Sequence, residues 1–141
     1  MTEPGIVYHP FAFDLRIGAT SAEIHRLEMK FEEVGANKLV AYVSVAGRPG
    51  FAKITFPHVD IFRVIDEMHL TLEENARLTV GHLSNHCAYR IEGSPFWAPQ
   101  RAVFEAVLPG STHYRFVTGG SCLDAISRDQ PEISWVLTIQ D

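Results

Sequence analysis

Cysteine is scarce in this sequence, because Cys87 and Cys122 are the only two among 141 residues. Small secreted domains that depend on disulfides carry many more, so a disulfide framework is excluded. Long hydrophobic runs are also missing, since no stretch approaches the roughly 18 apolar residues that a membrane-spanning helix needs. The N-terminus, MTEPGIVYHP, lacks the basic start and apolar run of a secretory signal. These absences predict a cytoplasmic protein that has no membrane partner.

Basic residues are outnumbered, with 12 Lys and Arg against 17 Asp and Glu, so the net charge is −5. Nucleic-acid-binding proteins normally carry a basic stripe that replaces counterions on phosphates, so a nucleic acid partner is not expected. The sequence also contains no GxSxG elbow, P-loop, GxGxxG fingerprint or CxxC pair. We therefore expect a protein without enzymatic activity, and we assign no catalytic residue and no cofactor.

The sequence is rich in alternating apolar and polar residues, which is the pattern of half-buried strands. It occurs in residues 11–17, 24–31 and 131–139, and Phe11, Phe13, Leu15 and Ile17 would share one face of the first. Residues 59–70 are apolar on both faces, which favours a central strand over a short helix beginning near Asp60.

One helix is expected near residues 99–108, where Pro99 suits the first turn and Pro109-Gly110 ends the apolar stripe. No internal repeat or linker divides the chain, so residues 1–141 are expected to form a single domain. The fold class is predicted to be mostly β: an antiparallel β-sandwich or a closed barrel of about nine strands with one short helix.

The segment HYRFVTGGSCLDAIS, residues 113–127, is predicted to form a hairpin that turns at Gly119-Gly120, with positive φ at the glycines. Counting from that turn places Arg115 opposite Asp124 and puts Tyr114, Phe116, Leu123 and Ala125 on one core face. The Arg115–Asp124 pair on the other face would contribute well under about 1 kcal/mol if exposed. In this register His113 lies too far from Cys122 to activate it, so Cys122 is not expected to be a nucleophile.

A metal-binding site is one hypothesis for the histidines, because the segment GHLSNHC places His82, His86 and Cys87 close together. Two histidines four residues apart converge on one metal when they lie on a helix. Here Gly81, Ser84 and Asn85 indicate a turn instead, so we expect no bound metal.

Three segments, ITFPHVDIFRVIDE, YRIEGSPFW and HYRFVTGGSCLDAIS, follow one another between about Lys53 and Trp135. Their order resembles that of small uncharacterised bacterial β-rich proteins, some of immunity or antitoxin type. The resemblance implies a non-enzymatic binding protein and brings no catalytic residues with it.

The leading functional hypothesis is a protein that binds, and by binding could neutralise, a cationic protein partner. The candidate contact residues are the paired carboxylates and one aromatic residue: Glu32, Glu33, Asp66, Glu67, Glu73, Glu74 and Trp97. The rival hypothesis is a β-barrel that holds a small molecule and acts as a carrier, or as an isomerase or hydrolase using His113 or an inward carboxylate. An enclosed cavity would favour the rival, whereas a filled interior with an exposed acidic or aromatic patch would favour the binding protein.

Overall fold

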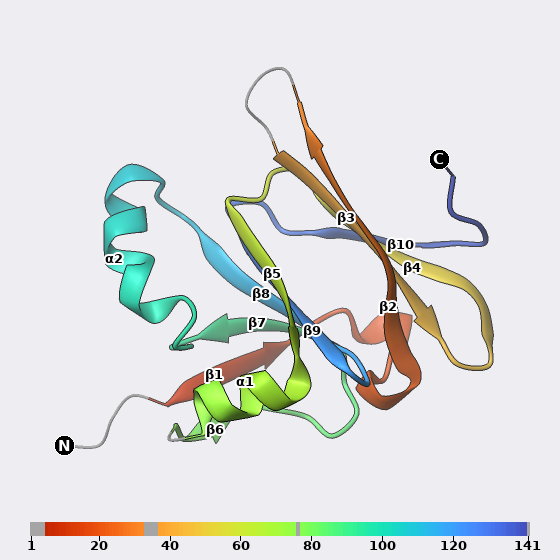
Figure 1. Ribbon diagram of the computed structural model, residues 1–141, viewed down its shortest axis with the longest axis horizontal. Helices are drawn as coiled ribbons and strands as arrows, with labels where there is room; N and C mark the ends of the chain where they lie inside the picture. Colours follow the sequence, from red (N-terminus) through yellow and green to blue (C-terminus); the bar gives the residue numbers. More distant parts are fainter. Residues whose placement is uncertain (1–4, 33–36, 76, 141) are drawn as a thin grey trace.

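The computed structural model describes residues 5–32, 37–75 and 77–140, and their strands form two sheets (Figure 1). The larger sheet has the order β5-β9-β8-β7-β1-β6, with bounds β1 Ile6–Pro10, β5 Ile61–Asp66, β6 Thr79–Val80, β7 Ala88–Glu92, β8 Thr112–Val117 and β9 Ser121–Ser127. The smaller sheet has the order β10-β4-β3-β2, with bounds β2 Ala22–Phe31, β3 Asn37–Val45, β4 Arg48–Phe56 and β10 Glu132–Val136. Neighbouring strands are antiparallel except β1 and β6, which are parallel.

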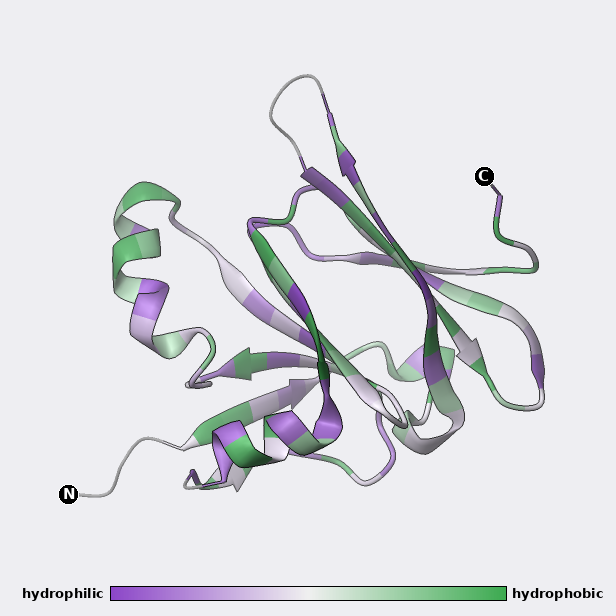
Figure 2. Cartoon of the chain, in the orientation of Figure 1, coloured by the Kyte–Doolittle hydropathy of each residue, from purple (hydrophilic) through white to green (hydrophobic). Residues whose placement is uncertain are grey.

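In the described part of the chain, the strands are connected by two α-helices and two short 3₁₀ helices: α1 Glu67–Glu74, α2 Ala98–Val107, η1 Phe13–Leu15 and η2 Ala19–Ser21. The helix expected near residues 99–108 is confirmed as α2, with a proline in its first turn. Along α1, hydrophilic and hydrophobic residues alternate, as Figure 2 shows. Within the described residues, no helix combines the length and apolarity needed to cross a membrane.

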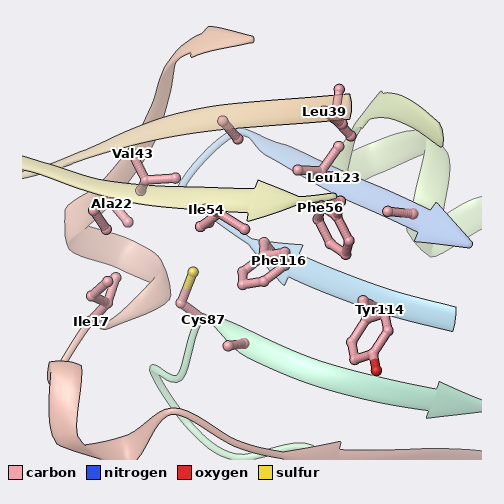
Figure 3. Close-up of a cluster of buried hydrophobic side chains, with 14 of the residues drawn as sticks. Ile17, Ala22, Leu39, Val43, Ile54, Phe56, Cys87, Tyr114, Phe116 and Leu123 are labelled. Atoms are coloured by element: carbon pink, nitrogen blue, oxygen red, sulfur yellow. The ribbon is translucent and has the colours of Figure 1, made fainter. Parts of the chain in front are cut away.

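The main hydrophobic core lies between the two sheets (Figure 3). Strands β3 and β4 contribute Leu39, Val43, Ile54 and Phe56 among others, and β7, β8 and β9 contribute Ala88, Tyr114, Phe116, Leu123 and Ala125. A hollow between the sheets, bordered by Ile54 and Phe116 among others, has a volume of about 10 Å³. That is room for about one water molecule, so this part of the interior is filled by side chains.

The expected mostly β architecture is confirmed, with ten strands among the described residues where about nine were predicted. Of the two architectures, the structure is sandwich-like, because the described strands form two sheets rather than one closed barrel.

The strand expected over residues 11–17 is wrong. Ala12 and Arg16 adopt left-handed backbone conformations, with φ of 59° and 53°, on either side of η1. This reversal turns Phe13 outward to 59% exposure, although Phe11 and Leu15 still pack against the main core. The alternating apolar residues Phe11 and Leu15 are therefore partly buried, although the backbone between them is not extended.

The single strand favoured for residues 59–70 is half right, because β5 ends at Asp66 and α1 begins at the next residue. The carboxylate of Asp66 accepts a hydrogen bond from the Met68 backbone N–H at 2.8 Å. Such a side-chain cap satisfies a donor that the first turn of a helix leaves without a partner. Asp66 thus marks the change from strand to helix.

The hairpin over residues 113–127 is confirmed, including the pairs Arg115–Asp124, Phe116–Leu123 and Val117–Cys122. The expected positive φ at its turn is wrong, since neither Gly119 nor Gly120 is in the left-handed region. The turn is closed by Thr118, whose backbone N–H and hydroxyl both donate to the Ser121 carbonyl oxygen.

Candidate functional site: a buried charged network beside helix α1

The outer face of the larger sheet, which points away from the smaller sheet, carries charged side chains that are nevertheless buried. Alternation along β8 and β9 sends Phe116 and Leu123 into the main core and sends Arg115 and Asp124 to this outer face. Both Arg115 and Asp124 have 0% exposure. The surface location considered for this pair is therefore wrong, because α1 and the segment before α2 cover the face.

Asp124 is the centre of this arrangement. Its Oδ1 accepts hydrogen bonds from Arg115 Nε and His113 Nε2, both at 2.7 Å. Its Oδ2 accepts from Arg63 Nε at 3.0 Å, and Arg63 is the cross-strand neighbour of Asp124 on β5. A buried carboxylate that receives three charged or polar donors is well satisfied, which offsets the cost of taking it out of water.

Helix α1 joins the network through two consecutive glutamates. Glu73 accepts two hydrogen bonds from the Arg63 guanidinium, at 2.6 and 2.9 Å. Glu74 Oε1 accepts from the Tyr8 hydroxyl at 3.1 Å and from Arg115 Nη1 at 3.2 Å. We call Tyr8, Arg63, Glu73, Glu74, Ser94, His113, Arg115 and Asp124 the charged network. It connects four strands of the larger sheet, β1, β5, β8 and β9, to α1.

Ser94, His113 and Asp124 form the most catalytic-looking part of the network. Ser94 Oγ lies 2.9 Å from His113 Nδ1, and His113 Nε2 lies 2.7 Å from Asp124. These partners fit a neutral imidazole in which Nε2–H donates to Asp124 and Nδ1 accepts from the serine hydroxyl. The ring is reversed relative to the usual serine-histidine-aspartate triad, in which Nε2 faces the serine.

Access decides what this triad can do. Ser94 has 0% exposure, and its Oγ already accepts a hydrogen bond from the Trp97 backbone N–H at 3.2 Å. The Phe96 ring packs against His113 with a centroid separation of 5.3 Å, and the Arg63 guanidinium lies over the same Phe96 ring in a cation–π contact at 4.1 Å. A nucleophile must reach its substrate, so the geometry makes Ser94 a structural anchor for the turn before α2.

Burial and charge shift the protonation of the network in opposite directions. Burial alone would raise the pKa of Asp124, but the His113 hydrogen bond and the charge of Arg115 outweigh it and hold that pKa well below its usual range. Burial lowers the pKa of His113, and the bond to Asp124 offsets only part of this. Burial raises the pKa of Glu74 against the opposing charge of Arg115. His113 is therefore neutral near pH 7.

We expect the free energy of unfolding to respond to pH through His113. Because the folded pKa is lowered, the unfolded chain binds a proton at residue 113 that the folded chain does not, so stability falls as pH drops from 7.5 through 6.5. The contribution is at most about 1.4 kcal/mol per pH unit. Urea unfolding at pH 7.5, 6.5 and 5.5 measures it, and His113→Gln should remove this slope.

Glu74 should change the free energy of unfolding with pH in the opposite direction to His113, so it serves as an internal control. Because the pKa of Glu74 is raised in the folded chain, the folded chain retains a proton that the unfolded chain has lost. Glu74 therefore favours the folded state as pH falls toward the pKa of this group in the unfolded chain. Glu74→Gln should therefore steepen the acid-side loss of stability. An unchanged slope in both variants would contradict these protonation assignments.

The structure brings together some of the sequence-predicted contact residues and separates others. Asp66, Glu67 and Glu73 lie on or next to α1 and are exposed, although Glu73 is paired with Arg63. Glu74 and Trp97 are 9% and 3% exposed, so neither side chain lies on the open surface. Glu32 is exposed at the end of β2, away from this cluster, and Glu33 lies outside the described residues.

A pocket of about 360 Å³ opens between α1 and the β1–β6 edge of the larger sheet. We call it the α1 pocket; it is lined by Tyr8, Glu67, Leu70, Thr71, Glu74, Asn75, Arg77, Thr79, His82, Val117 and Cys122. Gly81 has a φ of 84°, and a Cβ there would overlap the Tyr8 carbonyl oxygen. Glycine thus allows the His82 segment to approach β1 closely.

The residues singled out for metal or thiol chemistry have other surroundings. His82 stacks on Tyr89 with a centroid separation of 5.6 Å, and His86 Nε2 lies 2.8 Å from the Phe11 carbonyl oxygen. In the part of the chain that the structure describes, no three His, Cys, Asp or Glu side chains gather as a metal site. Cys122 has 0% exposure, and burial raises its pKa to about 12. These surroundings keep it a thiol rather than a thiolate nucleophile.

Sequence reasoning missed Arg63, Ser94 and Tyr8, and it did not place the other five members of the charged network in one cluster. The one available signal was the cross-strand Arg115–Asp124 pair, which lies at its centre. Comparison of the chain with protein-family models, with curated proteins and with solved structures finds no match. The function must therefore be argued from the geometry of this site and its surface.

Proposed function

We propose that this chain is a non-enzymatic binding protein that docks a cationic protein segment on the exposed face of α1. The observation that carries the proposal is the composition of that face. Met68 and Leu72, four residues apart, are 71% and 70% exposed, and the carboxylates of Asp66 and Glu67 lie beside them. An apolar centre with an acidic border is the composition of a surface that recognises a basic partner.

A hollow next to this face gives a partner a place to enter. It has a volume of about 410 Å³ and is lined by Asp66, Glu67, Met68, Thr71, Gly119 and Gly120, with no basic residue among them. The backbone N–H of Glu67 donates to the Gly120 carbonyl oxygen, which ties the start of α1 to the β8–β9 turn. The charged network holds the other end of the helix. Both attachments favour a preformed docking surface, which lowers the ordering cost of binding.

Two observations weigh against the carrier or enzyme hypothesis. The hollow between the sheets bordered by Ile54 and Phe116 has room for about one water molecule rather than a ligand. The Ser94–His113–Asp124 triad is buried beneath Phe96. A fluorophosphonate probe that labels Ser94 in the native protein would nevertheless reverse this choice and make the chain a hydrolase.

The test uses the immobilised chain to capture proteins from the source organism's lysate, followed by kinetics with the identified partner. Asp66→Asn combined with Glu67→Gln removes two charges while retaining the capacity of residue 66 to cap α1. We expect the double variant to bind about tenfold more weakly, and wild-type association to slow as salt rises. Asp129→Asn combined with Glu132→Gln is the control with equal charge loss at exposed positions elsewhere.

The proposal requires the captured partner to be basic and its binding to depend on α1. A partner whose affinity and salt dependence are the same for both double variants would contradict it. Co-purification of a stoichiometric small molecule without any protein would instead support the carrier hypothesis.

A further inference from the structure

The α1 pocket adjoins the proposed docking surface, because Glu67 and Thr71 line both the pocket and the hollow at the start of α1. A partner seated on α1 would therefore reach the pocket mouth. Most interfaces concentrate their binding energy in a few side chains that fill pockets of this kind. The chemistry of the pocket walls then indicates which side chain that would be.

Formal charges at the pocket and the charged network do not balance. Together they contain four carboxylates, Glu67, Glu73, Glu74 and Asp124, and three guanidiniums, Arg63, Arg77 and Arg115. Among these carboxylates and guanidiniums, one negative charge is thus in excess. A ligand with a single positive charge would complete the balance, whereas an anion would worsen it.

Among the described residues that line the pocket, the one buried side-chain polar atom without a hydrogen-bond partner is an acceptor. Glu74 Oε2 is buried and has no hydrogen-bond partner, although Arg115 Nη1 lies 3.0 Å away in an ion pair of poor geometry. A buried acceptor without a donor is costly. Because Glu74 lines the pocket, a donor that enters there would approach its carboxylate.

The remaining walls suit a flexible aliphatic stem. Leu70, Val117 and Cys122 supply apolar surface, and the Tyr8 and His82 rings meet edge to face at 5.1 Å between centroids. Methylene groups pack on such surfaces while a terminal ammonium reaches polar groups, and aromatic faces attract the cation. A volume of about 360 Å³ accommodates one side chain of this size.

We infer that the α1 pocket receives the ammonium group of a single lysine side chain, presented by the cationic partner and bound between Glu67 and Glu74. This inference rests on the proposed function, since it assigns an anchor residue to the partner that docks on α1. It distinguishes lysine from norleucine, which has a similar aliphatic stem and lacks the ammonium.

The pocket can be tested without the partner by NMR titration of the isotope-labelled chain with Nα-acetyl-lysine amide. We expect saturable shifts at backbone amides of Leu70, Thr71 and His82, and binding about tenfold weaker for Nα-acetyl-norleucine amide. Glu74→Gln should weaken lysine binding similarly, and Glu67→Gln, an exposed change that leaves the charged network intact, should do so if Glu74→Gln misfolds. Glu132→Gln is the charge-matched control and should bind as the wild type does.

Equal binding of the lysine and norleucine amides, or shifts confined to residues outside the pocket, would overturn the inference. Octalysine separates this failure from failure of the proposed function. If octalysine binds and is weakened by Asp66→Asn but not by Glu74→Gln, the docking surface stands and the lysine pocket is wrong. If octalysine and the identified partner both ignore Asp66→Asn with Glu67→Gln, the docking surface itself is wrong.

Discussion

Asp124→Asn is expected to destabilise the folded chain by about 3–5 kcal/mol, because it removes one partner from a buried set of ion pairs. The amide keeps the size of the carboxylate but cannot neutralise Arg115, which is fully buried. It also replaces one of the two acceptor oxygens by an NH2 donor, so either Arg63 loses its acceptor or His113 and Arg115 lose theirs. Since the free energy of unfolding of a native domain is about 5–15 kcal/mol, the loss is a large fraction of the total stability. Urea unfolding at pH 7.5 measures it.

Asp129→Asn is the matched control, because Asp129 is exposed and the same substitution there should change stability by less than about 0.5 kcal/mol. Hydrogen exchange adds a spatial test. Loss of Asp124 should accelerate exchange in α1, which is attached through Glu73 to Arg63 and through Glu74 to Arg115. A loss below about 1 kcal/mol would place the Arg115–Asp124 pair in the class of weak surface ion pairs, as the sequence alone suggested.

The hairpin shows what local sequence can determine. Two adjacent glycines set the turn, and alternation on either side set the register and the core face, so Arg115 was placed opposite Asp124 correctly. The prediction of positive φ at Gly119 and Gly120 is wrong, because Thr118 closes the turn through its own hydroxyl. Register depends on near neighbours, which sequence reveals, whereas the details of turn closure depend on which of several local hydrogen bonds forms.

Burial of the outer face could not be predicted in the same way. Whether an Arg–Asp pair faces water depends on what packs over it, and here the cover comes from α1, which brings Glu74 to Arg115 across 41 positions of sequence. Helix α1 could not be distinguished from a strand in the apolar run over residues 59–70, because Asp66, which ends β5 and caps the helix, is the only residue that marks the change. Trp97 was misplaced for a similar reason, because its ring packs on Phe104 beneath α2 at 5.0 Å.

Phe116→Ala is expected to destabilise the fold by about 3–5 kcal/mol, through lost burial and the cavity left behind. Phe116 is 1% exposed in the core between the sheets, and its ring meets Phe11 and Phe56 edge to face at 5.9 and 6.2 Å between centroids. The hollow beside it has a volume of only about 10 Å³, so the side chains around Phe116 are closely packed. Removing the ring would therefore leave a new cavity. Thermal and urea unfolding provide the measurement.

Phe31→Ala serves as the comparison, since Phe31 is 81% exposed and its truncation should change stability by less than about 0.5 kcal/mol. The two variants remove the same atoms from one buried and one exposed position, so their difference reports the contact between the sheets. Equal, small effects would mean that the sheets do not pack as a sandwich. In that case the interior could accommodate a ligand, and the carrier hypothesis would gain over docking on α1.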